Sequence, residues 1–142
     1  MAYTRNAPDA QPRILIVDDD WLNCEVLEAY LESAGYVVLS AHDGARAFAV
    51  ISETPVDLVL LDVRMPGMDG YEVCAKLKRS PVTRRIPVIM VTALEQEGDK
   101  LRAVEAGADG FVTKPFDFPL LLSRIKSLLH IKGDEPGVET AD

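Results

Sequence analysis

The sequence predicts an α/β fold, in which five helices cover both faces of a doubly wound, five-stranded parallel sheet of order 2-1-3-4-5. Short apolar segments alternate five times with segments of helical periodicity, and such alternation is typical of a parallel sheet with crossover helices. Three apolar segments, 13–17, 57–61 and 86–91, are nearly uninterrupted, as in strands covered on both faces. The other two are more mixed and are expected at the flanks.

Each element has a local signal in the sequence. The strands are expected at 13–17, 36–40, 57–61, 86–91 and 109–113. The helices are expected at 20–34, 43–52, 70–79, 95–106 and after residue 117. Gly35 and Gly107 stand where a helix commonly ends in a left-handed residue. Asp20, Asp69 and Asp117 stand where an N-cap is expected.

Helical spacing indicates which side of the first and last helices faces the sheet. In the first helix, residues four apart in sequence are expected on one face: Leu22, Val26, Tyr30 and Ala34. In the last helix, the expected apolar face carries Leu121, Ile125 and Leu128.

The length of 142 residues suits one domain. We expect an N-terminal tail at 1–12, the domain at 13–132 and an acidic C-terminal tail at 133–142. The tail holds four of the 23 acids and no base, so it supplies half of the net charge of −8. This charge argues against nucleic-acid and membrane binding. No apolar run has the length of a membrane span, and two cysteines are too few for a disulfide framework, so the cytoplasm is expected.

Polar residues follow the strands at the edge where ligands bind in open parallel sheets. They are Asp18, Asp19 and Asp20 after the first strand, Asp62 after the third, Thr92 after the fourth and Lys114 after the fifth. Crowded carboxylates repel one another unless a cation neutralises them. Oxygen ligands without histidine or cysteine suit Mg²⁺.

These residue types also indicate a reaction. Asp62 stands alone on the middle strand and is the candidate nucleophile for a phosphoryl group. Asp19 and Asp62, with a carbonyl from residue 64, are expected to bind the metal that stabilises in-line transfer. Lys114 and the Thr92 hydroxyl remain as donors for an anionic, tetrahedral group.

Four segments together resemble the receiver domain of two-component response regulators, which has a flavodoxin-like fold. They are 16–19 (IVDD), 60–70 (LLDVRMPGMDG), 91–93 (VTA) and 114–116 (KPF). The resemblance covers about residues 12 to 131 and implies that a histidine kinase or a histidine phosphotransfer protein phosphorylates Asp62. It implies Mg²⁺ bound by Asp18, Asp19, Asp62 and the backbone carbonyl of Arg64, and a cis bond between Lys114 and Pro115.

The resemblance also implies a switch rather than an enzyme that acts on separate substrates. Thr92 would move toward the phosphoryl group and Phe111 would turn inward behind it. The face formed by the fourth helix, fifth strand and fifth helix would then change and act on an effector protein or an output domain. The same face could instead bind a second copy of the chain and form a phosphorylation-dependent homodimer.

Some positions depart from the family pattern or vary within it. Phe111 replaces tyrosine and has no hydroxyl. Arg64 and Leu94 occupy the two positions that commonly tune phosphoryl lifetime, and Leu94 has no polar group to hold water. We therefore expect slow self-dephosphorylation. Asp20 is interpreted as a helix cap rather than a metal ligand.

Other functions share parts of this pattern. An aspartate-nucleophile phosphatase of small phosphate esters also uses aspartate, Mg²⁺ and lysine, but its nucleophile typically follows the first strand in Asp-x-Asp. A flavin-binding electron carrier needs a phosphate loop after the first strand, where an acidic triplet would repel phosphate. Segments 97–102, 105–109 and 121–126 resemble receivers at the front of diguanylate cyclases, yet we favour a free-standing protein over an excised piece.

The remaining polar and thiol residues receive structural interpretations. His42 and His130 are expected to be isolated surface residues, and Cys24 and Cys74 small groups buried at least in part. A basic cluster is expected to be a solvated helix end, and it comprises Lys76, Lys78, Arg79, Arg84 and Arg85.

Overall fold

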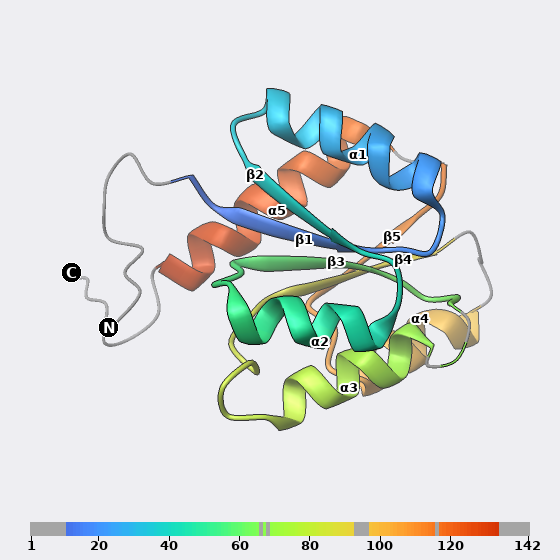
Figure 1. Cartoon of the computed structure of the whole chain (residues 1–142). Coiled ribbons are helices and arrows are strands. Elements are labelled where there is room, and N and C mark those ends of the chain that lie inside the picture. The colour runs from blue at the N-terminus through green and yellow to red at the C-terminus, as the bar shows by residue number, and fades with distance from the viewer. Residues whose placement is uncertain (1–10, 66, 68, 93–96, 116, 134–142) are drawn as a thin grey trace.

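A computed structural model describes residues 11–133, apart from 66, 68, 93–96 and 116. Five parallel strands form one sheet of order β2-β1-β3-β4-β5, which confirms the predicted fold. The strands are β1 (Arg13–Val17), β2 (Val37–Ala41), β3 (Leu58–Asp62), β4 (Val88–Thr92) and β5 (Gly110–Thr113). The helices are α1 (Trp21–Ser33), α2 (Gly44–Glu53), α3 (Gly70–Arg79), α4 (Glu97–Glu105) and α5 (Phe118–Gly133). Figure 1 shows α1 and α5 on one side of the sheet and α2, α3 and α4 on the other.

Burial follows the predicted strand order. Every residue of β3 and β4 is buried, because neighbouring strands pair with them on both sides and helices cover both faces. In the flanking strands β2 and β5, only Ala41 and Val112 are buried. The mixed composition of the two flanking strands was therefore a correct signal for their position.

Side chains alternate between two apolar cores, one on each face of the sheet. Leu15 and Val17 of β1 join the core under α2, α3 and α4, whereas Ile14 and Ile16 join the core under α1 and α5. Cys74 and Cys24 lie in the first and the second core, respectively, so the expected burial of both thiols is confirmed.

The expected face of α1 is only partly correct, because Tyr30 packs against the core beneath the helix whereas Ala34 is exposed. Leu22 and Val26 are 69% and 47% exposed, and the helix instead buries Cys24, Leu27 and Leu31. Both sets have helical spacing, so periodicity offered two apolar stripes and packing against the sheet selected the second. The expected face of α5 is confirmed, with Leu121 and Ile125 fully buried and Leu128 packed against the same core.

The boundaries of several elements differ from expectation by one or two residues. β3 begins one residue later than expected and includes Asp62, which pairs with Val91 of β4. β2 is also one residue later and ends at Ala41. The three expected N-caps are present, because Asp20, Asp69 and Asp117 each accept a backbone N–H three residues ahead. Within the part of the chain described, no helix is long and apolar enough to cross a membrane.

Candidate functional site

The carboxyl edge of the sheet brings three carboxylates together. Asp18 and Asp19 follow β1, and Asp62 ends the neighbouring strand β3. One oxygen from each of the three lies within 4.8 Å of the other two. Asp18 is 3% exposed and Asp62 8% exposed, whereas Asp19 faces solvent. Three hard oxygen donors at this spacing, one of them open to water, fit the coordination chemistry of Mg²⁺.

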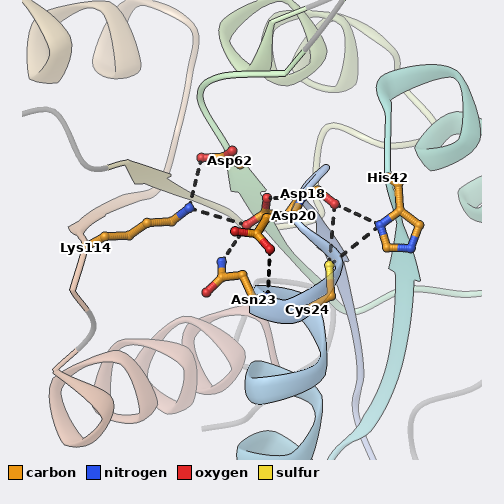
Figure 2. A network of polar contacts seen from close by, with 7 residues as sticks. All are labelled: Asp18, Asp20, Asn23, Cys24, His42, Asp62 and Lys114. Atoms are coloured by element: carbon orange, nitrogen blue, oxygen red, sulfur yellow. Dashed lines mark hydrogen bonds and ion pairs between the residues drawn. The ribbon is translucent and has the colours of Figure 1, made fainter.

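Lys114 lies between two of these carboxylates, as Figure 2 shows. Its Nζ is 3.5 Å from Asp18 Oδ2 and 3.6 Å from Asp62 Oδ1. The backbone N–H of Lys114 donates to the Thr92 carbonyl over 2.8 Å, which anchors the end of β5 beside β4. The peptide bond to Pro115 is cis, as the resemblance implied.

Local structure after β1 fixes Asp18. Its Oδ1 accepts the backbone N–H of Asp20 over 2.9 Å, and its Oδ2 accepts Nδ2 of Asn23 over 2.6 Å. Asp20 is the N-cap of α1, so the helix start and the Asp18 carboxylate hold each other in place. Asp20 thus behaves as a cap, as expected, and stands outside the carboxylate cluster.

The surroundings of Asp62 disfavour its ionised form. Burial and, after it, the negative charge of Asp18 raise its pKa to about 6, against the opposing effect of Lys114. At neutral pH the ionised Asp62 carboxylate lies beside other negative charges that Lys114 does not fully compensate. A divalent cation would stabilise its ionised form.

The raised pKa predicts how Asp62→Asn changes stability in cation-free buffer. The folded protein binds the Asp62 proton up to about pH 6, while the unfolded chain releases it near 3.8. The wild type therefore loses stability as pH rises through this window, and the Asn variant does not. We expect the variant to be the more stable protein at pH 7.5, with the difference shrinking toward pH 4. Urea unfolding at both pH values checks this, and a constant difference would contradict it.

The remaining predicted residues lie at the same edge or close to it. Thr92 ends β4 and is 1% exposed, and Phe111 is half-buried on β5, where it pairs with Met90. Thr92 and Phe111 point to the same face of the sheet, because Met90 is two residues before Thr92 and packs in the same core as Phe111. Arg64 is exposed just beyond β3, and Leu94 lies outside the described residues.

His42 is not the isolated surface residue that we expected. It is half-buried directly after β2, and its Nδ1 lies 3.0 Å from the Asp18 carbonyl oxygen. The sequence did contain a signal, because the rule that collects strand-end residues applies to every strand. The predicted site includes the ends of four strands but not the end of the second, which lies beside β1. Asn23 was missed too, although it stands in the first turn of α1, within reach of Asp18.

The basic cluster near the end of α3 includes a structural lysine. Lys78 Nζ donates to the carbonyls of Arg84 and Ile86 and pairs with Asp109 Oδ2 over 2.7 Å. These contacts connect α3, the loop that follows it and the start of β5. The solvated interpretation therefore does not hold for Lys78.

Both thiols are expected to react slowly in the folded protein. Burial raises the pKa of Cys24 to about 12, helped by the charge of Asp18, and burial raises that of Cys74 to about 11. Because the thiolate is the reactive form, native protein at pH 8 should be alkylated far more slowly than protein in urea. Mass spectrometry after timed iodoacetamide treatment measures this. Rapid native labelling of Cys24 would show that the packing around Asp18 opens readily.

A parallel α/β sheet with clustered aspartates and a lysine at its carboxyl edge is the arrangement of a signalling receiver. The sequence model of one protein family, the response regulator receiver domain, matches residues 14–126 of the chain. The chain therefore belongs to the family of response regulator receiver domains. It is a family of signalling proteins rather than of enzymes in the usual sense, and receiver domains typically use Mg²⁺.

Curated relatives agree with this assignment. The chain is 48% identical over 120 residues to response regulator PleD of Caulobacter vibrioides, covering 84% of this chain and 26% of that protein. It is 44% identical over 119 residues to the DNA-binding dual master transcriptional regulator RpaA of a Synechocystis species, covering 84% and 49%. The chain thus spans between a quarter and a half of the length of these two relatives.

Solved structures agree in fold. A response regulator from Chloroflexus aurantiacus superposes with a TM-score of 0.82 at 37% identity, over 85% of this chain and 99% of that one. The receiver domain of a histidine kinase from Syntrophus aciditrophicus gives 0.82 at 40% identity, over 92% and 99%.

Proposed function

We propose that the protein accepts a phosphoryl group on Asp62 from a histidine kinase or a histidine phosphotransfer protein, with Mg²⁺ as cofactor. The observation that carries this proposal is the arrangement around Asp62. A carboxylate that is 8% exposed lies within reach of two further carboxylates and of a lysine that contacts it. The Asp62 nucleophile therefore has carboxylates beside it that can bind a cation, and a lysine beside it that can donate hydrogen bonds to an anion.

Asp62 and Lys114 have different roles in the transfer of the phosphoryl group. An Asp62 oxygen forms the new bond to phosphorus as the bond from phosphorus to the donor imidazole nitrogen breaks, and the imidazole then takes up a proton. Lys114, already 3.6 Å from Asp62 Oδ1, pairs with a phosphoryl oxygen. Bound Mg²⁺ supplies positive charge to the carboxylate and the phosphoryl oxygens together.

The aspartates of the cluster have different roles in binding Mg²⁺. Asp19 and Asp62, whose oxygens lie within 4.8 Å of each other, would be the direct ligands, and the backbone carbonyl of Arg64 would join them. Asp18 is already held by Asn23, by Lys114 and by the N–H of Asp20, so its part is to orient the site as well as to add charge.

The response to phosphorylation passes through β4 and β5. The Thr92 hydroxyl moves toward the phosphoryl group, and Phe111 turns into the space behind it. Their shared sheet face supports this coupling. The surface of α4, β5 and α5 then changes its contacts with an effector protein, an output domain or a second copy of the chain.

The setting of the protein is part of the proposal. Residues 13–132 act as the receiver unit, between the tails 1–12 and 133–142. Two buried free cysteines support action in the reducing cytoplasm. Self-dephosphorylation is slow, as expected from Leu94.

Phosphorylation by a small donor tests the proposal. The protein is incubated with acetyl phosphate and Mg²⁺, and intact mass is followed with time. We expect a stoichiometric gain of one phosphoryl group that disappears when EDTA replaces Mg²⁺, and that decays over hours after the donor is removed. No mass gain at any Mg²⁺ concentration would overturn the proposal, and decay within minutes would overturn the slow dephosphorylation alone.

A further inference from the structure

The backbone around Asp18 is tied to the end of β2 on both sides. Its N–H donates to the Ala41 carbonyl over 3.0 Å, and its carbonyl oxygen lies 3.0 Å from Nδ1 of His42. A carbonyl oxygen accepts hydrogen bonds only, so Nδ1 carries the proton and donates. His42 thereby extends the hydrogen bonding between β1 and β2 by one step beyond the last paired residues, Val17 and Ala41.

A second contact covers the same imidazole. The Trp21 indole stacks on the His42 ring, with centroids 3.6 Å apart and planes 26° from parallel. Trp21 is 68% exposed, so the stack lies at the surface. Trp21 is the first residue of α1, and Asp18 directly follows β1. The His42 side chain therefore contacts both ends of the loop that carries Asp19.

Cys24 completes the packing around this point. Its thiol lies 3.5 Å from the Asp18 carbonyl oxygen and 3.8 Å from His42 Nδ1, and Figure 2 shows the three groups converging. The Asp18 carbonyl thus faces an imidazole and a thiol, while its carboxylate faces Asn23 and Lys114. The peptide that joins Asp18 to Asp19 is fixed from the side away from the cluster.

We propose that His42 is a positioning residue for the metal site: through its hydrogen bond to the Asp18 carbonyl it pre-organises the loop that presents Asp18 and Asp19 to Mg²⁺. The inference rests on the proposed function, since it concerns the same cation. Its physical basis is that a ligand loop ordered before binding loses less conformational entropy when the ion binds. His42 itself contacts neither the ion nor the phosphoryl group.

Two substitutions separate the two contacts of His42. His42→Phe retains an aromatic ring to stack on Trp21 and removes the donor. His42→Asn removes the ring and places an amide N–H where Nδ1 was. Mg²⁺ is titrated into each protein while backbone amide NMR shifts are followed. We expect the Phe variant to raise the Kd roughly threefold to tenfold, as for one lost hydrogen bond. The Asn variant should stay within about twofold of the wild type, because the bond to Asp18 is the one that orders the ligand.

Acetyl phosphate gives a second readout. Half-saturation of the phosphorylation rate should require more Mg²⁺ in the Phe variant, while the rate at saturating Mg²⁺ should match the wild type. His130→Phe is the matched control and should change neither quantity, because His130 is exposed near the C-terminal end of α5. Figure 1 shows that this end of α5 lies away from the carboxyl ends of the strands.

The outcomes distinguish this inference from the proposed function. An unchanged Kd in His42→Phe overturns the inference, and so does an equal loss in both variants that follows their loss of stability in urea. Asp19→Asn reports on the cation site itself. If Mg²⁺ binds the wild type and the Asp19 variant equally, or binds neither, the proposed site fails and the inference fails with it. If only the Asp19 variant loses affinity, the site stands and the role of His42 is refuted.

Discussion

Asp62→Asn is expected to abolish phosphorylation by acetyl phosphate, with the initial rate falling at least about a hundredfold. The amide has nearly the shape of the carboxylate, but it has no anionic oxygen to attack phosphorus and removes one charge from the metal ligands. Asp62 is 8% exposed and carries a pKa raised to about 6, so its neutral replacement does not strain the fold. Intact-protein mass spectrometry measures the loss directly.

A second Asp→Asn change makes this result specific. Asp69 caps α3 in the loop after β3, and its carboxylate accepts the backbone N–H of Glu72 over 2.9 Å. Asparagine is also a good N-cap, so Asp69→Asn should keep the helix and the wild-type rate of phosphorylation. Equal labelling of wild type and Asp62→Asn would refute the assignment of the phosphoacceptor. Loss of labelling in both variants would point to a general sensitivity of this loop.

Gly70→Ala is expected to have the second-largest effect, through the backbone of the same strand. A Cβ at Gly70 would overlap the carbonyl oxygen of Asp62 and lie 2.9 Å from Val63 Cα. Both neighbours are backbone atoms of a buried strand end, so α3 must move away from β3. The N–H of Gly70 also donates to the Val63 carbonyl over 2.8 Å, and this bond would be stretched.

The expected cost is about 2–3 kcal/mol in the free energy of unfolding, typical of overpacking at a rigid site. Phosphorylation should slow at least about tenfold, because displacement of a reacting group by a fraction of an ångström is costly. Urea unfolding and acetyl phosphate kinetics measure the two effects. Gly98→Ala in α4 is the control, since its Cβ would meet open space: the phosphorylation rate should stay near wild type, and stability should be unchanged or higher by up to about 1 kcal/mol. Equal behaviour of the two variants would show that the contact between α3 and β3 is soft.

The sheet and the main site could be predicted because both follow from topology. Parallel strands separated by helices place their carboxyl ends at one edge, so residues far apart in sequence, such as Asp18 and Lys114, were expected to meet. Their contact at 3.5 Å agrees with that expectation. Only the order of strands and the residue that follows each one were needed.

Packing choices could not be predicted in the same way. α1 carries two apolar stripes, and the sequence alone does not say which one faces the sheet, because both satisfy helical spacing. Cys24, Leu27 and Leu31 are buried, so Leu22 and Val26 lie at the surface. The partners of a polar side chain also depend on the register of neighbouring strands. β2 ends one residue later than expected, and this register places His42 at the Asp18 carbonyl.

The most direct measurement locates the phosphoryl group on the chain. Protein treated with acetyl phosphate and Mg²⁺ is reduced with borohydride, which converts an aspartyl phosphate to homoserine, and peptides are then sequenced by mass spectrometry. We expect homoserine at position 62 and at no other aspartate, in proportion to the mass gain of the intact protein. Homoserine at another position, or a phosphoryl mass gain without any homoserine at position 62, would contradict phosphorylation of Asp62.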